Sequence, residues 1–290
     1  MSYITIRGVD HYYQWIKQDS SALNENESTR SKGVMVFIHG WGGSSRYWEP
    51  VAQAMSAEFD CLLYDLRGFG RSQASPTSED QIKSVYDLET YALDLATLLE
   101  ALGLDQVTLH SHSTGSSIAA IFLNRYPDLV QTAILTCNGI FEFEAKAFEQ
   151  FHRLGGYVVK FRPRWMCSIP GLADLFMARF LTRSIAREYK TQFLADFVDA
   201  DYQAALGTML TAVSKDAADS MPTEFSRLPC PTLLVSGARD KIIPAEMGAK
   251  AAALNPHITH HVIERTGHFP MLEAPQQYLT RVSDFMAAAC

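Results

Sequence analysis

The sequence predicts an α/β protein: a mostly parallel central sheet with helices on both faces and a helical segment inserted into the chain. Short apolar runs alternate with amphipathic helical patterns through residues 1–138 and again through residues 223–290. Residues 139–222 instead show helical periodicity and no convincing strand. We therefore expect a core made from residues 1–138 and 223–290, with residues 139–222 inserted as a helical cap.

The first part of the core begins with a predicted hairpin and continues with buried strands. Residues 3–7 and 11–16 flank a turn, and residues 19–32 have the composition of a polar surface loop. Four apolar runs predict buried parallel strands, at residues 34–38, 61–64, 107–109 and 133–137. Helical patterns follow the first three of them, starting near Ser45, within residues 80–102 and near Ile118.

The cap is predicted to be helical, and the core resumes after it. Helices are expected in the cap at residues 143–151, 176–185 and 193–206. The second part of the core then supplies two strands and two helices, at residues 231–235, 259–263, 245–254 and 275–288.

One stretch of the cap is basic, in a chain whose net charge is -7. Eight basic residues and only two acidic ones lie between Arg153 and Lys190. Arg179, Arg183 and Arg187 recur at every fourth position and predict one basic helical face. Such a face is either simply solvated, or it attracts an anionic or amphiphilic substrate or a membrane surface.

Bulk composition restricts the function classes. The chain has 290 residues, of which 47% are hydrophobic and 20% charged, as in an ordinary globular protein. Its negative charge argues against nucleic acid as a partner. No apolar run approaches the ~18 residues of a membrane span, and residues 1–16 lack a signal-peptide pattern. Because the five cysteines are odd in number and dispersed, we expect reduced thiols and a cytoplasmic location. The oligomeric state stays open.

A tight turn between the third buried strand and its helix is the first chemical signal. The stretch Ser111-His112-Ser113-Thr114-Gly115 matches the Gly-x-Ser-x-Gly nucleophile elbow, with its first glycine replaced by serine. Small residues two before and two after Ser113 suit the strained backbone of such a turn. Ser113 is therefore the candidate nucleophile. The pattern also fits a serine-rich helix N-cap. The choice between the two interpretations depends on whether the chain also supplies a suitable histidine and acid.

Five motifs in order resemble the α/β-hydrolase fold over nearly the whole chain. They are His39-Gly40-Trp41-Gly42, the segment 65–72, the segment 111–115, the segment 237–244 and the segment 265–270. The resemblance implies the chain order nucleophile, acid, histidine, which Ser113, Asp240 and His268 satisfy. It implies that His268 takes the serine proton and that Asp240 orients the imidazole. Asn138, where some relatives place their acid, cannot carry the charge.

The same resemblance assigns an oxyanion hole to the backbone N–H groups of Trp41 and Thr114. His112, Trp165 and Phe180 are further expectations for substrate binding, with His112 more often a buried hydrogen-bonded histidine than a catalytic one. The histidines are not spaced with carboxylates or thiolates as metal ligands are, so we expect no metal and no cofactor.

The function that this resemblance implies is cleavage of the carboxylic ester of an apolar or amphiphilic small-molecule substrate, through an acyl-enzyme. Two alternatives lie within the same fold: a cofactor-free haloperoxidase or perhydrolase, and a carbon–carbon bond hydrolase that would use basic cap residues to hold a carboxylate. A third, of another class, is a small-molecule receptor that keeps a hydrolase fold. A serine at position 113 disfavours the dehalogenases and epoxide hydrolases, because they use an aspartate nucleophile.

Overall fold

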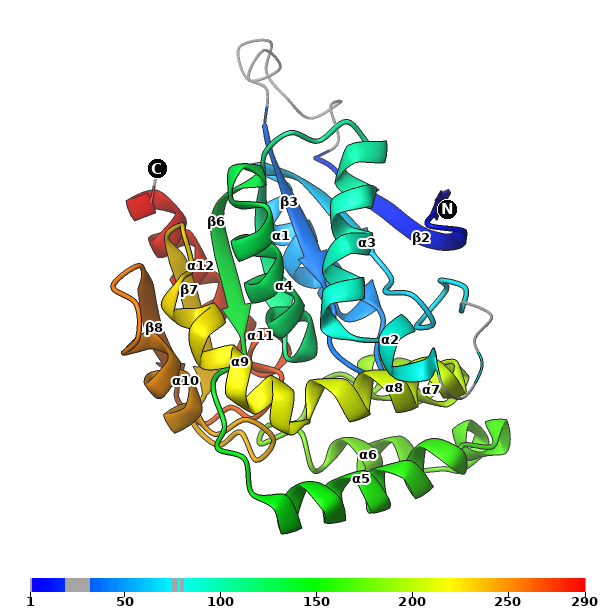
Figure 1. The fold of residues 1–290 in the computed structure, drawn as a ribbon. Coiled ribbons are helices and arrows are strands. Elements are labelled where there is room, and N and C mark those ends of the chain that lie inside the picture. Colours follow the sequence, from blue (N-terminus) through cyan, green and yellow to red (C-terminus); the bar gives the residue numbers. More distant parts are fainter. Residues whose placement is uncertain (1, 19–31, 75–77, 79–80, 290) are drawn as a thin grey trace.

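An eight-stranded sheet forms the centre of the computed structural model (Figure 1). The structure describes residues 2–18, 32–74, 78 and 81–289. The strand order is β1-β2-β4-β3-β5-β6-β7-β8. β1 pairs antiparallel with β2, and β2 with β4, while the remaining neighbours pair in parallel. The expected mostly parallel sheet is confirmed. The polar loop expected at residues 19–32 lies outside the described residues, except for Lys32.

The strands lie close to the ranges that the apolar runs predict. Their bounds are β1 Ser2–Ile6, β2 Val9–Ile16, β3 Gly33–Ile38, β4 Phe59–Tyr64, β5 Val107–His112, β6 Val130–Thr136, β7 Thr232–Gly237 and β8 Ile258–Ile263. The inner strands carry side chains that are buried on both faces of the sheet, which is why their sequences are apolar runs without alternation.

Helices cover both faces of this sheet. The core helices are α1 Glu49–Met55, α2 Ile82–Val85, α3 Leu88–Ala101, α4 Thr114–Arg125, α10 Ala245–Ala252, α11 Pro270–Glu273 and α12 Pro275–Ala289, with short 3-10 turns η2 Ser45–Trp48 and η4 Pro127–Leu129. The helix expected within residues 80–102 is two helices. Asp87 separates them, because its side chain accepts a hydrogen bond from the N–H of Thr90 and so begins α3.

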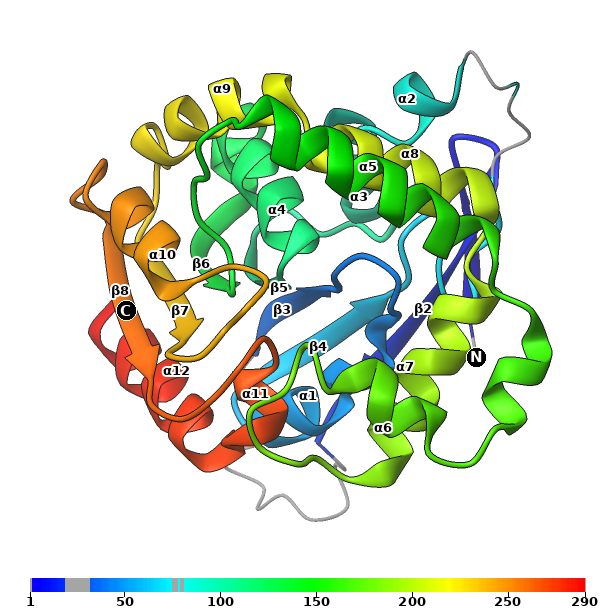
Figure 2. The same ribbon diagram turned by 90° about the horizontal axis from the view of Figure 1, so that it is seen from below.

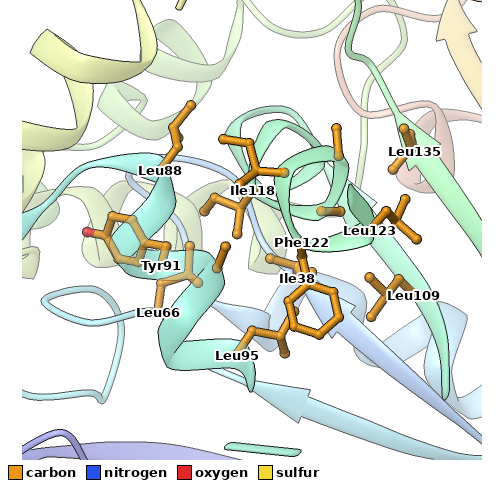
Figure 3. Close-up of a cluster of buried hydrophobic side chains, with 14 of the residues drawn as sticks. Ile38, Leu66, Leu88, Tyr91, Leu95, Leu109, Ile118, Phe122, Leu123 and Leu135 are labelled. Carbon is orange, nitrogen blue, oxygen red and sulfur yellow. The ribbon is translucent and has the colours of Figure 1, made fainter. Parts of the chain in front are cut away.

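Two apolar clusters hold these layers together. On one face, α3 and α4 pack on side chains such as Ile38, Leu109 and Leu135 (Figure 3). On the other face, α1 and α12 pack on the alternate residues of the same strands, including Met35 and Phe37. Consecutive residues of one strand therefore enter opposite clusters, as strand geometry requires. This packing fixes α4 against the sheet, and α4 begins two residues after the end of β5.

The described part of residues 139–222 contains helices and no strand. The helices are α5 Ala145–Lys160, η5 Arg164–Ser168, α6 Leu172–Met177, α7 Arg187–Asp199, α8 Tyr202–Ala212 and α9 Lys215–Ser226. Figures 1 and 2 show α5 to α8 at the end of the molecule toward which the parallel strands point. The division into core and cap stays a prediction, and we use "cap" for residues 139–222.

The predicted basic helical face is wrong. α6 ends at Met177, Arg179 lies in a turn and Arg183 in a bend, and of these arginines only Arg187 belongs to a helix. Backbone groups of this segment bond to the core instead of to a helix: Phe180 accepts from the N–H of His268, and Arg183 donates to Glu273. Periodicity alone could not reveal these tertiary hydrogen bonds. Phe143 also precedes the first turn of α5.

Candidate active site

Ser113 occupies a strained turn between β5 and α4. Its φ of 53° and ψ of -123° lie in a region that residues with a Cβ rarely adopt. The turn is fixed by a hydrogen bond of 2.8 Å from the N–H of Ser113 to the carbonyl of Thr136. A Cβ on Gly115 would meet the carbonyl oxygen of His39 at 2.5 Å, so only glycine lets α4 begin this close to β3. The local geometry is that of a nucleophile elbow.

The structure joins Ser113, His268 and Asp240 in one chain of hydrogen bonds. Nε2 of His268 lies 3.0 Å from Oγ of Ser113, and Nδ1 lies 2.7 Å from Oδ2 of Asp240. The other oxygen of Asp240 accepts from the N–H groups of Ile242 and Ile243, at 2.8 and 3.1 Å. The Asp240 carboxylate therefore accepts hydrogen bonds from two backbone N–H groups and from the imidazole. A carboxylate held in this way can orient the imidazole and stabilise its cation.

Three loops at neighbouring strand ends bring these side chains together. Ser113 follows β5, Asp240 follows β7, and His268 follows β8. A Cβ on Gly237 would lie 2.0 Å from the carbonyl oxygen of Gly267, so the loops after β7 and β8 touch where glycine leaves room. The contact between Asp240 and His268 depends on this close approach.

Trp41 and Thr114, the residues expected to form an oxyanion hole, lie at the cavity that contains Ser113. Both residues line one cavity with Ser113 and His268. Thr114 is the first residue of α4, where an N–H has no acceptor within its helix. Within the described chain, no hydrogen bond occupies the N–H of Trp41. Such donors can stabilise an oxyanion that forms on a carbonyl attacked by Ser113.

His112 holds three parts of the site in register. Nε2 lies 2.8 Å from the carbonyl oxygen of His268, and Nδ1 lies 3.0 Å from the hydroxyl of Tyr47. The Tyr47 oxygen accepts from the N–H of Gly40 at 2.6 Å. A carbonyl only accepts, so the proton of His112 is on Nε2. Burial, and then the neighbouring charge of His268, lower the pKa of His112 well below its usual range, so the ring is neutral.

Two residues missed by the sequence reasoning fix the surrounding loops. Glu273 accepts from the N–H of Gly267 through one oxygen and from the N–H groups of Thr182 and Arg183 through the other. It therefore ties the His268 loop to the cap. Tyr47 is the second, through the contacts described above. Neither residue belongs to a recognisable motif. Glu273 could have been noticed as an acidic residue five positions after His268, and the structure shows that it is buried.

Asn138 has a structural place in the elbow. Its side-chain amide donates to the carbonyl of Ser113 at 2.7 Å and to the hydroxyl of Ser117 at 2.9 Å. The carbonyl of Ser113 lies at the first turn of α4, so these bonds fix the orientation of the elbow from the end of β6.

The cavity above Ser113 is small and apolar, with a volume of about 140 Å³. Besides the residues already named, its walls are formed by Phe151, Phe180, Phe193, Thr208, Met209, Ala212, Val213, Ile242, Ile243 and Phe269. Phe180 and His112 thus line it, as expected from the sequence. No lysine, arginine, aspartate or glutamate is among the described residues that line it. A ligand held here is therefore favoured when uncharged and apolar.

The structure does not bring Trp165 to this cavity, which corrects its expected part in substrate binding. Trp165 lies in η5 with 58% of its surface exposed, and its ring packs edge-on against Phe161. The sequence shows that the cap is aromatic but not which aromatic side chains point inward. Arg179 and Arg183 are also absent from the cavity walls.

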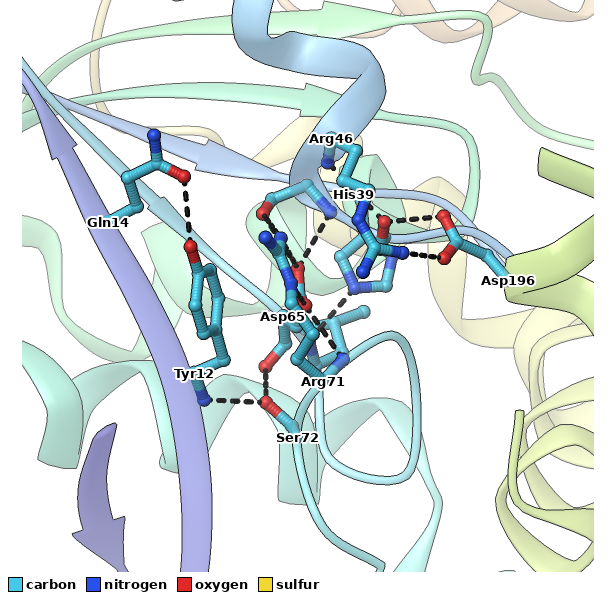
Figure 4. A network of polar contacts seen from close by, with 11 residues as sticks. Tyr12, Gln14, His39, Arg46, Asp65, Arg71, Ser72 and Asp196 are labelled. Carbon is cyan, nitrogen blue, oxygen red and sulfur yellow. Dashed lines mark hydrogen bonds and ion pairs between the residues drawn. The ribbon is translucent and has the colours of Figure 1, made fainter. Parts of the chain in front are cut away.

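A polar network connects the loop after β3 to the core and to the cap (Figure 4). His39 accepts from the N–H of Leu66 at 2.9 Å, and Asp65 accepts from Ser45 and Arg71. Burial alone would raise the pKa of Asp65, but the hydrogen bonds and charge of Arg71 lower it below its ordinary value.

On the cap side of this network, Asp196 of α7 accepts from the hydroxyl of Ser44 at 2.5 Å and pairs with Arg46. Burial raises the pKa of Asp196 to about 6, although Ser44 and Arg46 act in the opposite direction. The loop that carries Trp41 is therefore held from both sides.

One group of side chains has the proximity of a metal site. Ligand atoms of His112, Cys137 and His268 lie within 4.8 Å of one another. Both ring nitrogens of each histidine already have partners, and burial followed by the charge of Asp240 raises the pKa of the Cys137 thiol well above its usual range. A metal there would need a thiolate and would displace these bonds. The absence of a metal and of a cofactor stays a prediction.

Comparison with known families identifies the fold. The family model described as the alpha/beta hydrolase fold matches residues 33–275. The chain belongs to this α/β-hydrolase family. The matched range contains Ser113, Asp240 and His268. In the described part of the chain, no helix is long and apolar enough to span a bilayer.

Individual relatives of this α/β-hydrolase are distant. The uncharacterized hydrolase YugF of Bacillus subtilis is 23% identical over 282 residues, which cover 97% of this chain and 96% of that protein. An esterase from Thermogutta terrifontis has a TM-score of 0.76 at 22% identity, covering 99% of this chain and 98% of that one. A hydrolase from Pseudomonas aeruginosa has a TM-score of 0.78 at 18% identity, covering 98% and 97%. At these identities the solved structures show the fold, and the family shows a hydrolase.

Proposed function

We propose that this α/β-hydrolase cleaves small, uncharged carboxylic esters through an acyl-enzyme. The observation that carries the proposal is the hydrogen-bond chain from Ser113 through His268 to Asp240, which opens into an apolar cavity. The esterase among the structural neighbours supports the same reaction class by analogy.

In the proposed reaction, His268 takes the proton from Ser113 as the serine oxygen attacks the ester carbonyl. The carbonyl oxygen becomes an anion that accepts from the N–H groups of Trp41 and Thr114. His268 then gives its proton to the departing alcohol, which leaves an acyl group on Ser113. A water molecule, deprotonated by His268, attacks this acyl group and releases the acid and free Ser113.

The cavity walls favour an ester over the ring-cleavage products of the carbon–carbon bond hydrolases. Those substrates carry a carboxylate, and holding one in an apolar cavity would leave an uncompensated charge unless a basic side chain paired with it. The described cavity walls offer no lysine or arginine. The walls also set a limit on size, because about 140 Å³ holds a short acyl or alcohol group before the surrounding side chains must move.

A p-nitrophenyl ester series from acetate to decanoate tests this proposal. We expect turnover that is highest for short chains, a pre-steady-state burst of p-nitrophenol equal to the enzyme concentration, and neither with Ser113→Ala. Ser283→Ala, at an exposed position of α12, is the matched control for the loss of a serine hydroxyl. Ligand binding without any turnover would instead support a receptor. Turnover in peroxide and acetate without ester hydrolysis would support a perhydrolase.

A further inference from the structure

The helix α5 presents an apolar stripe to solvent. Its inner side is formed by residues such as His152, which bonds to the carbonyl of Val213, and the buried Val159. On the other side, Phe151, Leu154 and Val158 are 43%, 61% and 51% exposed. Their spacing of three and four residues places them in one row along the helix. The helix α5 therefore exposes these large apolar side chains in addition to burying others, such as Val159, on its inner side.

The stripe continues beyond the end of α5. Phe161 is 68% exposed, and its ring lies 6.4 Å from that of Trp165, which is 58% exposed. We call Phe151, Leu154, Val158, Phe161 and Trp165 the apolar cap face. Single exposed apolar side chains are common, but a continuous group of large ones marks an interaction surface.

A basic row borders this face. Lys146, Arg153 and Lys160 follow one another at intervals of seven residues, which is nearly two helical turns, so they lie along one edge of α5. All three are exposed, and in the described residues none forms an ion pair. Glu149 is the single acidic residue of the helix.

We propose that the apolar cap face and this basic row dock onto an anionic lipid surface. In such a complex the apolar side chains enter the region between headgroups and acyl chains, while the lysines and the arginine contact anionic headgroups. Tyr157, at 67% exposure, and Trp165 have amphipathic rings that suit the headgroup level. A second copy of the chain fits less well, because pairing two such faces would bring two basic rows together.

This surface adjoins the cavity of the candidate active site. Phe151 belongs to the apolar cap face and also lines the cavity that contains Ser113. Figure 1 shows α5 as the outermost helix at the end of the molecule toward which the parallel strands point, and Ser113 and His268 of the cavity follow two of those strands. An ester dissolved in the lipid would therefore reach the cavity from the docked side. Only this consequence rests on the proposed function, because docking itself is independent of turnover.

Vesicle co-sedimentation tests the docking. We expect the parent protein to bind vesicles of phosphatidylcholine and phosphatidylglycerol in equal parts, to bind phosphatidylcholine alone much more weakly, and to lose affinity as salt rises. Arg153→Gln with Lys160→Gln should weaken binding about tenfold or more, as should Leu154→Ser with Val158→Ser. The matched controls are Arg281→Gln and Leu254→Ser, which remove an exposed cation and an exposed leucine from other elements.

Trp165 supplies a second readout. Its fluorescence should shift to shorter wavelength when anionic vesicles are added, and Trp165→Phe should remove that shift while the protein still sediments with vesicles. Turnover of p-nitrophenyl acetate by each variant checks that it is folded, and binding without any turnover would contradict the proposed function alone.

The docking proposal fails if the parent does not sediment with anionic vesicles, or if the paired variants bind as the parent does. It also fails if sedimentation velocity without lipid shows a dimer that Leu154→Ser with Val158→Ser dissociates, because the face would then be a contact between copies of this chain.

Discussion

His112 donates a hydrogen bond from Nε2 to the backbone carbonyl of His268, across 2.8 Å. The bond joins the residue before the candidate nucleophile to the backbone of the candidate base. On its other side His268 is held by the carbonyl of Phe180, which accepts from its N–H at 2.7 Å. Both backbone polar groups of His268 are therefore fixed, and so is the position of its ring relative to Ser113.

We expect His112 to act as a positioning residue. His112→Leu replaces the imidazole with an apolar side chain of similar size and removes both hydrogen bonds, so kcat for p-nitrophenyl acetate should fall roughly tenfold to a hundredfold with little change in KM. His112→Gln can still donate and accept, and it should recover part of the loss. Equal losses in both variants, or a change confined to KM, would contradict this role.

Phe180 and Trp165 form a matched pair for substrate length. Phe180→Ala enlarges the cavity and should shift the preferred acyl chain to longer esters, because each methylene placed in an apolar pocket contributes ~1–3 kcal/mol to discrimination. Trp165→Ala removes an even larger aromatic side chain outside the cavity and should leave the profile in detergent-free solution unchanged. kcat/KM across the p-nitrophenyl series measures both. The same shift in the two variants would show that the cavity walls do not set the length.

His110 should make the fold sensitive to acid. Burial lowers the pKa of this imidazole from 6.5 to about 3 in the folded protein. A group with a lowered pKa in the folded state contributes stability that is fully present above pH 6.5 and is lost as the pH falls toward 3. Each such group adds about 1.4 kcal/mol per pH unit to the slope of the unfolding free energy.

Urea unfolding at a series of pH values between 4 and 6.5 measures this slope. His110→Gln should reduce the slope by about one proton and retain a partner for the hydroxyl of Tyr278. His257→Gln, at an exposed position, is the matched control for the loss of an imidazole, and the slope of His110→Gln is compared with it. An unchanged slope in His110→Gln would contradict the prediction, because His110 would then bind the same number of protons in the folded and in the unfolded protein.

Chelation tests the prediction that no metal takes part. Ser113, His268 and Asp240 already satisfy one another's hydrogen bonds, so we expect EDTA to leave ester turnover unchanged. Turnover that is lost with EDTA and restored by a divalent ion would instead assign function to the group of His112, Cys137 and His268.

The arrangement of the candidate site could be predicted from the sequence because each of its parts follows a strand. Buried parallel strands are visible as apolar runs, and their carboxyl ends meet at one edge of the sheet. A candidate catalytic residue in the motif after one apolar run is therefore expected close to the candidate residues after the neighbouring runs. The choice of Ser113, Asp240 and His268 came from the resemblance to the α/β-hydrolase fold, and the structure places these side chains, far apart in the chain, within hydrogen-bond distance of one another.

The cap was less predictable, because its contacts are tertiary. The spacing of Arg179 and Arg183 predicts a helix, but backbone groups nearby bond to His268 and Glu273 instead. The aromatic content of the cap likewise cannot separate Phe180, which faces the cavity, from Trp165, which faces solvent. Tyr47 bonds to Gly40 and His112 through a fold contact that no local pattern announces.

Mapping the adduct of a fluorophosphonate probe tests the central claim most directly, because the probe reacts with a serine that a neighbouring base activates. Digestion and mass spectrometry should find the adduct on Ser113 in the parent protein and no adduct in Ser113→Ala. His268→Ala should keep Ser113 but slow its labelling by about 10³-fold or more, since the base is then missing. An adduct on Ser111 or Ser117, or labelling of Ser113 that does not depend on His268, would contradict the account.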